Sequence, residues 1–277
     1  MKKLTVIVPC YNEEEGIGQV IAKLPRDKLQ AYGCSLHVLV VDNNSKDKTA
    51  EVARAAGADV ITETKQGKGH AVRRAFYSVP NDTDYVVMLD GDDTYNASEI
   101  WRLVEPIDSG FAKVIIGSRM HGNIREGSMK PLNRLGNRVY SRLVRTGYKV
   151  KVTDVLTGYY AWSREVIEAL RPHLNAGDFT IEMEMMTKMA RLGYDIYSVP
   201  ISYDSRLGSS SLNPIIDGYR ILKTYVRNLR WKPSRQLEIA GVFMPATEQQ
   251  SAPFALATAI DKELFGESKA AEDSARL

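Results

Sequence analysis

Short apolar runs alternate with longer amphipathic stretches along the first half of the chain. The runs at residues 4–8, 36–41 and 85–89 are rich in Val, Ile and Leu and are too short for buried helices, so they predict strands. Strands that alternate with helices predict an α/β fold with a doubly wound, mostly parallel sheet. The expected strands are residues 4–8, 36–41, 59–62, 85–89 and 114–117, and the expected helices are residues 12–25, 46–56, 68–78 and one that begins at Asn96.

Two asparagines are predicted to cap helices. Asn12 precedes three glutamates, and the helix dipole favours acidic side chains in the first turn. Asn96 lies three residues before Glu99, a spacing that is typical of a capping box.

The second half of the chain has a less regular pattern. Helices are expected at residues 132–146, 179–192 and 212–231, and an edge strand at residues 196–200. From about residue 247 onward Gln, Ala, Ser, Glu and Lys dominate, and this composition predicts a disordered tail.

Composition and charge change this picture little. The chain has 277 residues, of which 44% are hydrophobic and 26% are charged, as is usual for a globular protein. The net charge of +3 gives no indication of a nucleic-acid partner. Cys10 and Cys34 form neither a disulfide framework nor a metal motif, so a cytoplasmic, reducing compartment is expected. The sequence predicts neither a signal peptide nor a membrane-spanning helix.

The apolar run at residues 85–89 ends abruptly in acidic residues. Asp90 and Asp92, separated by Gly91, are expected at the carboxyl edge of the sheet, where open α/β sheets bind their ligands. Two carboxylates one residue apart are typical ligands of a divalent cation that also holds substrate phosphates, such as Mg²⁺ or Mn²⁺. A surface turn is the alternative, since Asp-Gly is also a turn signal.

Four blocks in a fixed order carry a family resemblance. Together they resemble the family 2 glycosyltransferases, which have the GT-A fold, a Rossmann-like variant of the doubly wound sheet. Several segments of the second half resemble dolichyl-phosphate and bacterial polyprenyl-phosphate mannosyl- and glucosyltransferases. The four blocks are residues 6–14, 40–49, 66–71 and 89–93, and the segments of the second half are residues 117–119, 131–134, 154–159, 179–182, 199–201 and 206–210.

The resemblance implies a domain division. Residues 1–231 would form one GT-A domain, with a nucleotide-sugar half at about 1–118 and an acceptor half at about 119–231. Residues 232–277 would be a C-terminal extension that ends in the disordered tail.

The resemblance also assigns a nucleotide-sugar site. Pro9 and Tyr11 would form a wall for the base, and Glu13 would accept hydrogen bonds from the ribose. Asp42 would accept hydrogen bonds from base N–H groups, unless it belongs only to an Asx-rich turn. Relatives usually carry an acid where this chain has Asn43, and an amide both donates and accepts, so the base is left open.

By resemblance, the next two blocks would bind the phosphates of the donor. Lys68 would lie beside the nucleotide, although a helix start with a glycine entry explains it equally well. Asp90 and Asp92, with Gly91 between them, would hold the metal ion against the diphosphate and stabilise the leaving group. Asp93 is a weaker candidate because its side chain should point away from that of Asp92.

Basic residues predict an anionic acceptor. By resemblance, Arg119, Arg134 and Arg206 would bind the acceptor phosphate or the donor diphosphate. Arg134 also belongs to a row of arginines at helical spacing, and a solvated basic face or an anionic membrane surface would explain that row as well.

A carboxylate near the acceptor would be needed only for a hydroxyl acceptor, because a phosphate is already ionised. Glu182 is the candidate catalytic base. Glu184, two residues on, must face another direction and is expected to be exposed to solvent. Asp154 is a further carboxylate that could line the site.

The last expected helix is amphipathic. An apolar stripe formed by Leu222, Tyr225, Val226 and Leu229 is flanked by basic residues. The stripe could lie at a membrane interface or pack on the domain, and any membrane contact would be peripheral.

The resemblance, together with the metal-ligand pattern at Asp90 and Asp92, implies a metal-dependent glycosyltransferase. It would move a hexose from GDP-mannose or UDP-glucose to a polyprenyl or dolichyl phosphate, with inversion at the anomeric carbon. One alternative keeps this chemistry with a soluble sugar or small-molecule hydroxyl as acceptor. Another is an inactive protein that binds sugar nucleotides and acts in regulation.

Overall fold

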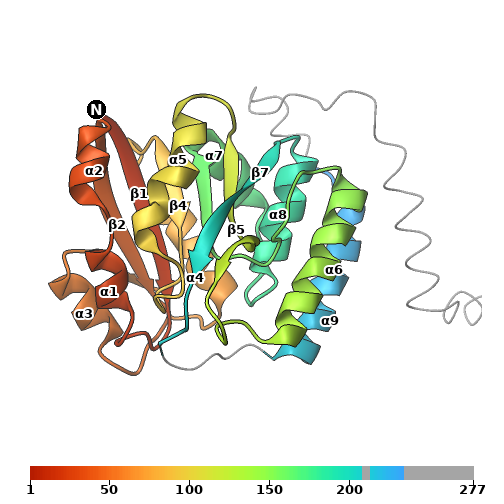
Figure 1. Ribbon diagram of the computed structural model, residues 1–277, viewed down its shortest axis with the longest axis horizontal. Coiled ribbons are helices and arrows are strands. Elements are labelled where there is room, and N and C mark those ends of the chain that lie inside the picture. Colours follow the sequence, from red (N-terminus) through yellow and green to blue (C-terminus); the bar gives the residue numbers. More distant parts are fainter. Residues whose placement is uncertain (208–212, 234–277) are drawn as a thin grey trace, which may run out of the picture.

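A computed structural model describes residues 1–207 and 213–233 of the chain. Its centre is a single seven-stranded sheet with helices on both faces (Figure 1). The described strands are β1 (Lys2–Cys10), β2 (Cys34–Asp42), β3 (Asp59–Thr62), β4 (Tyr85–Met88), β5 (Val114–Ile124), β6 (Tyr160–Ser163) and β7 (Ile196–Tyr203).

The described helices include two short 3₁₀ turns. They are α1 (Ile17–Ala22), α2 (Arg26–Ala31), α3 (Thr49–Ala55), α4 (Lys68–Ser78), η1 (Ala97–Glu99), α5 (Ile100–Asp108), α6 (Pro131–Tyr148), α7 (Arg164–Leu170), η2 (Arg171–His173), α8 (Ile181–Arg191) and α9 (Pro214–Leu229).

The sheet has the order β3-β2-β1-β4-β6-β5-β7. Neighbouring strands are parallel except that β6 runs antiparallel to both β4 and β5. The α/β fold with a mostly parallel sheet is therefore confirmed, and so is the edge position of β7. Because β1, β2 and β4 are parallel, their carboxyl ends meet at one edge, which lies opposite the N-terminus (Figure 1).

Alternating side chains of each strand pack on opposite faces of the sheet. In β1, Val6 and Val8 belong to a core beneath α1, α2 and α5, whereas Ile7 belongs to a second core beneath α4, α7 and α8. This division follows from the two-residue repeat of a strand. The sheet is thus covered by helices on both faces, and it leaves its edges and strand ends for ligands.

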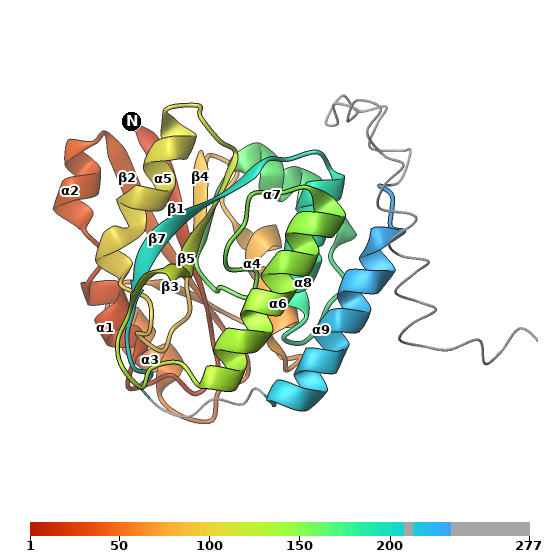
Figure 2. The ribbon, with the colours of Figure 1, turned by 45° about the vertical axis from the view of Figure 1, so that its right-hand side comes forward.

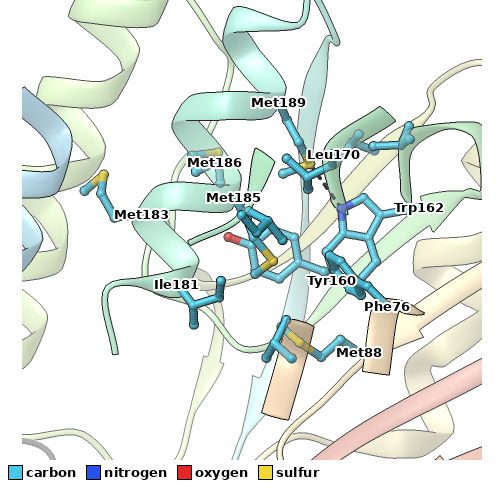
Figure 3. Packing of buried hydrophobic residues seen from close by; sticks show 14 of the residues in the cluster. Phe76, Met88, Tyr160, Trp162, Leu170, Ile181, Met183, Met185, Met186 and Met189 are labelled. Atoms are coloured by element: carbon cyan, nitrogen blue, oxygen red, sulfur yellow. Dashed lines mark hydrogen bonds between the residues drawn. The ribbon is translucent and has the colours of Figure 1, made fainter. Parts of the chain in front are cut away.

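Methionines and aromatic rings fill the second core. Trp162 of β6 packs edge-on against Phe76 of α4 and is stacked with Tyr160. Its indole N–H donates to the Sδ atom of Met189 on α8 at 3.2 Å (Figure 3). These contacts fix α8 against the sheet, and α8 carries Glu182 of the site described below.

The prediction that a helix begins at residue 12 is wrong. Asn12 does not cap it, because its backbone is left-handed (φ 54°) and its Oδ1 atom accepts from the backbone N–H of Lys46. Helix α1 begins only at Ile17, so the glutamates precede it, and a separate helix, α2, follows Pro25.

Asn96 does cap η1, since its side chain accepts from the backbone N–H of Ser98. The expected capping box is incomplete, because the carboxylate of Glu99 accepts instead from the backbone N–H of Ser202 on β7.

In the second half, α6, α8, α9 and β7 occupy the expected places within a few residues, whereas β6 and α7 were not predicted. The expected boundary between residues 118 and 119 falls inside β5. The predicted tail from residue 247 lies outside the described residues, as does residue 234 onward of the extension. Within the described part of the chain, no helix is both long and apolar enough to cross a bilayer.

Candidate active site

A cavity of about 490 Å³ opens at the carboxyl edge of β1 and β4. Its walls come from both halves of the chain. Pro9, Tyr11 and Glu13 follow or end β1, and Asp90 and Asp92 follow β4. The lining also includes Gly67 and Lys68 from the first half and, from the second half, Arg119, Gly158, Glu182 and Arg206.

Lys68 joins two carboxylates at the floor of this cavity. As the first residue of α4, it places its Nζ 2.8 Å from Oδ1 of Asp90 and 2.7 Å from Oε1 of Glu182. Burial opposes the charged form of Asp90, but the adjacent ammonium holds the pKa of Asp90 below its ordinary value. Burial raises the pKa of Glu182 although Lys68 lowers it. The three groups form one buried network of a cation and two carboxylates.

Asp92 forms a second charged group with Arg206. Its Oδ1 atom accepts from the backbone N–H and the hydroxyl of Thr94, so the side chain is fixed. Its buried Oδ2 atom accepts no hydrogen bond within the described residues and lies 2.5 Å from Nη2 of Arg206. Burial and the charge of Asp90 raise the pKa of Asp92.

Glu13 lies on the other side of the same guanidinium. Its Oε1 atom is 3.6 Å from Nη1 of Arg206. Burial and the charge of Asp92 raise the pKa of Glu13 to about 8, although Arg206 lowers it. The crowding of these carboxylates therefore favours the neutral form of Glu13, and a further cation beside them would favour the charged form instead.

Glycines allow the walls to approach each other. A side chain on Gly91 would collide with Sγ of Cys10, and one on Gly158 would come within 2.5 Å of Oδ2 of Asp90. Gly67 has φ 133°, a conformation that favours glycine, and it packs against the backbone of Gly177.

Arg119 is held rigidly in the cavity wall. Its Nε and Nη2 atoms donate to the two carboxylate oxygens of Asp154, each at 2.7 Å, and Nη2 also donates to the carbonyl of Leu156. Asp154 is completely buried and does not line the cavity, contrary to the expectation that it could. It orients Arg119 instead.

The segment after β2 has another arrangement than expected. Asp42 does not line the cavity, and its Oδ1 atom accepts from the backbone N–H of Ser45, three residues on, so its side chain closes a local turn. The side chain of Asn43 donates to the carbonyls of Glu63 and Lys65 and accepts from the N–H of Gly67. Asn43 thus clamps the loop that leads into Lys68. Sequence reasoning found the departure at Asn43 but not this clamp.

Arg134, Asp93 and Glu184 were also assigned positions from the sequence. Arg134 is exposed on α6 and does not line the cavity. Asp93 points away from the site, as expected, and pairs with Lys23 at 2.6 Å. Glu184 is not exposed, so that expectation is wrong: it is 1% exposed, because it pairs with Lys188 and accepts from the backbone N–H of Ala176.

The cavity also contains residues that sequence reasoning did not single out. Tyr95 accepts a hydrogen bond from the N–H of Gly158 at 2.7 Å, and Asp178 and Phe179 precede α8. Gly158 and Phe179 stand within segments that carry the family resemblance, so that signal was available, whereas nothing around Tyr95 indicated its position.

The oxygen atoms at the tip of β4 fit a divalent cation. Oδ2 of Asp92 is a buried acceptor without a hydrogen bond that already faces a cationic group. Within residues 1–207 and 213–233, no cluster of three or more His, Cys, Asp or Glu side chains could hold a metal. Mg²⁺ and Mn²⁺ sites often use only one or two carboxylates and complete the shell with phosphate and water oxygens.

Comparison with known proteins decides what this site belongs to. Residues 5–171 match the family described as Glycosyl transferase family 2. The chain is a family 2 glycosyltransferase. Glycosyltransferase AglJ of Haloferax volcanii is 39% identical to it over 215 residues, which cover 77% of this chain and 67% of that protein. The dolichyl-phosphate hexose transferase of the same organism is 34% identical over 224 residues, which cover 81% and 92%.

The fold of this glycosyltransferase is confirmed as GT-A by solved structures. Glucosyl-3-phosphoglycerate synthase from Mycobacterium tuberculosis, in complex with Mn²⁺, UDP and phosphoglyceric acid, has a TM-score of 0.63 and 23% sequence identity. The alignment covers 82% of this chain and 78% of that chain. In this glycosyltransferase the charged cavity lies at the carboxyl edge of the sheet, where open α/β sheets bind their ligands.

Proposed function

We propose that this glycosyltransferase transfers a hexose from a nucleotide sugar, GDP-mannose or UDP-glucose, to a polyprenyl or dolichyl phosphate. The reaction would be a direct displacement at the anomeric carbon, with inversion. An oxygen of the acceptor phosphate would form the new bond to that carbon, and the bond to the nucleoside diphosphate would break.

The donor would bind along the first-half wall. Pro9 and Tyr11 offer apolar surface for the base, and Glu13 is placed to accept hydrogen bonds from the ribose. Asn43 would act indirectly by fixing the loop before Lys68. Because the side chain of Asn43 is bound to this loop, groups other than that side chain would select the base.

Asp90 and Asp92 would hold Mg²⁺ or Mn²⁺ against the donor diphosphate. When bound, the cation supplies positive charge that stabilises the departing nucleoside diphosphate. Arg206 and Lys68 are close enough to these carboxylates to contact the same phosphates. Arg119, oriented by Asp154, would steer the acceptor phosphate.

One observation carries the choice of a phosphate acceptor. Among the described residues, each of the five carboxylates that line the cavity lies within 4 Å of a lysine or arginine nitrogen. A carboxylate that is ion-paired in this way must leave its cation before it can take a proton, whereas a phosphate acceptor needs no base. The pairs are Glu13 with Arg206, Asp90 with Lys68, Asp92 with Arg206, Asp178 with Arg220, and Glu182 with Lys68.

Similarity to a dolichyl-phosphate hexose transferase over 92% of that protein supports this choice. The alternative acceptor, a sugar or small-molecule hydroxyl, would need Glu182 to leave Lys68 and take a proton. The two acceptors therefore assign Glu182 different roles, as the positioning partner of Lys68 or as the base.

A nucleotide-sugar panel with polyprenyl phosphate and Mn²⁺ or Mg²⁺ tests the proposal. Radiolabelled hexose should partition into butanol, and excess chelator should abolish transfer. Asp92→Asn should lower the rate by about 10²-fold or more, the scale of losing a principal charge stabiliser. The matched control is Asp93→Asn, which changes the neighbouring acid that points away from the cavity. Label that stays in water with every donor would contradict the lipid acceptor.

Glu182→Gln separates the two roles of Glu182. As a positioning partner, it should still permit transfer, with a raised KM and an unchanged pH profile between pH 6 and 8. If Glu182 is the base, the variant should lose most of kcat, and the acidic limb of the pH profile, which reports protonation of the base, should disappear with it. The second result would favour the hydroxyl acceptor.

A further inference from the structure

Six large apolar side chains are exposed together on two helices. Leu132, Leu135 and Val139 recur at helical spacing on α6, and α9 begins with three more. Between 50% and 78% of each side chain is exposed. We call this set the apolar face, and its members are Leu132, Leu135, Val139, Ile215, Ile216 and Tyr219.

Helices α6 and α9 lie side by side and run in the same direction (Figures 1 and 2). The hydroxyl of Tyr140 donates to the carbonyl of Gly218 at 2.8 Å, and that of Tyr148, further along α6, donates to the carbonyl of Tyr225, further along α9. The two exposed apolar groups therefore lie at the same, N-terminal ends of both helices. The stripe expected to be a possible interface packs instead on the domain, with Tyr225 and Leu229 buried.

Positive charge borders the apolar face. Arg134 and Arg138 are exposed on α6, whose sequence contains no acidic residue, and Lys130 precedes it. In α9 the single acid, Asp217, is 7% exposed and pairs with Arg220. Apolar side chains bordered by Lys and Arg are typical of helices that lie on anionic membranes.

The same charges argue against a second copy as the occupant. A symmetric dimer would bring each copy of this face against the other and would place the arginines of α6 close to one another. Opposite charge is supplied by the head groups of an anionic bilayer.

The apolar face also lies near the mouth of the active site. Asn133, between Leu132 and Arg134, lines the cavity, and so does Ile221 of α9. The N-terminal ends of both helices lie at the end of the molecule to which the carboxyl edge of β1 points (Figure 2).

We propose that the apolar face docks on the surface of an anionic lipid bilayer. Its six side chains would enter the interfacial region, while Lys130, Arg134 and Arg138 contact lipid phosphates. The inference extends the lipid-phosphate acceptor of the proposed function, because a docked face would present the cavity to a head group held in the bilayer.

Vesicle sedimentation with the full chain tests this inference. Vesicles of phosphatidylglycerol and phosphatidylcholine should bind the protein at low salt, and binding should fall as salt is added. Leu135→Glu and Ile216→Glu should each lower the partition coefficient about tenfold or more, because each removes buried apolar surface and adds a repelled charge. Arg138→Gln should lower it about fivefold on the anionic vesicles only.

Phe111→Glu is the matched control. Phe111 is 67% exposed and lies just before β5, at the other end of the sheet, so this variant should bind vesicles like the wild type. The assay contains neither donor nor acceptor, so its outcome is independent of whether the proposed transfer takes place.

Two results would overturn the docking proposal. One is a wild-type chain that does not bind anionic vesicles, or variants of the apolar face that bind them unchanged. The other is sedimentation velocity that detects a dimer which Leu135→Glu dissociates, since this would assign the face to a second copy.

Discussion

The carboxylates of the cavity differ in the cation that each one faces. Asp90 and Glu182 share the ammonium of Lys68, whereas Asp92 and Glu13 share the guanidinium of Arg206. A guanidinium at 2.5 Å from Oδ2 of Asp92 stands where a divalent ion would compete for the same oxygen. Metal binding and the position of Arg206 are therefore coupled, because both cations would contact the carboxylate of Asp92.

Removal of this guanidinium should change metal affinity and rate in opposite directions. Arg206→Gln should tighten Mn²⁺ binding without nucleotide by about tenfold, since a competing unit charge leaves the carboxylate. The same variant should lose activity, because a group that would contact the diphosphate is gone. Electron paramagnetic resonance of free Mn²⁺ measures the affinity. Arg125→Gln, which changes an exposed arginine 3.7 Å from Asp204, is the control, and equal affinities in both variants would contradict the competition.

A buried histidine should make the fold sensitive to acid. Burial, and the charge of Lys188, lower the pKa of His173, and its Nε2 atom has no hydrogen-bond partner in the described residues. As pH falls below about 6.5, the unfolded chain takes up a proton that the folded chain does not, so stability falls with pH. His173→Gln should flatten this loss between pH 7 and 5 in urea titrations. His121→Gln, at an exposed position, should leave it as in the wild type.

Among the elements, those that were predicted best carry a strong local signal. Strand β3 and helix α4 begin and end where the sequence indicated, because an apolar run or a glycine entry marks their ends. Four-residue β6 and the start of α1 escaped prediction, since both depend on distant partners, such as Lys46 for the turn at Asn12.

The clamp at Asn43 gives the loop before α4 a testable role. Asn43→Asp removes two N–H donors and places a carboxylate against the carbonyls of Glu63 and Lys65, at about 1–3 kcal/mol for each unsatisfied group. We expect faster hydrogen exchange at Gly67 and a raised KM for the donor. Asn44→Asp, the same change at the exposed neighbour, should alter neither. An unchanged exchange rate at Gly67 in Asn43→Asp would contradict the clamp.

At the scale of the whole molecule, the site draws on both halves of the chain. Glu13 belongs to the first half and Arg206 to the second, and their side chains lie 3.6 Å apart in the lining of the cavity. The sequence located most of this set, because acids and glycines follow the strands in a recognisable order. It could not show which side chains are already bound to neighbouring groups. Asp42 accepts a hydrogen bond from Ser45, Asp154 pairs with Arg119, and Glu184 pairs with Lys188.

Ligand binding should therefore stabilise the domain as one unit. With Mn²⁺ and a nucleoside diphosphate at about 100 times Kd, unfolding should become harder by about 2.7 kcal/mol. For a domain of this size, Tm should rise by roughly 5–10 °C in a single transition. Comparison of UDP with GDP by thermal shift identifies the base. Chelator should remove the shift, as should Asp92→Asn, and a shift that survives both would contradict the metal site.

The reversed direction of β6 has a consequence for recombination between relatives. Because this strand runs antiparallel to β4, it starts at the ligand-binding edge, and the turn before it brings Gly158 against Asp90. A chimera joined at residue 118 would divide β5 between two parents. Asp90 would then come from one parent and Gly158 from the other. A junction after Ser163 would keep that contact within one parent, so donor specificity should be inherited with residues 1–163 as a block.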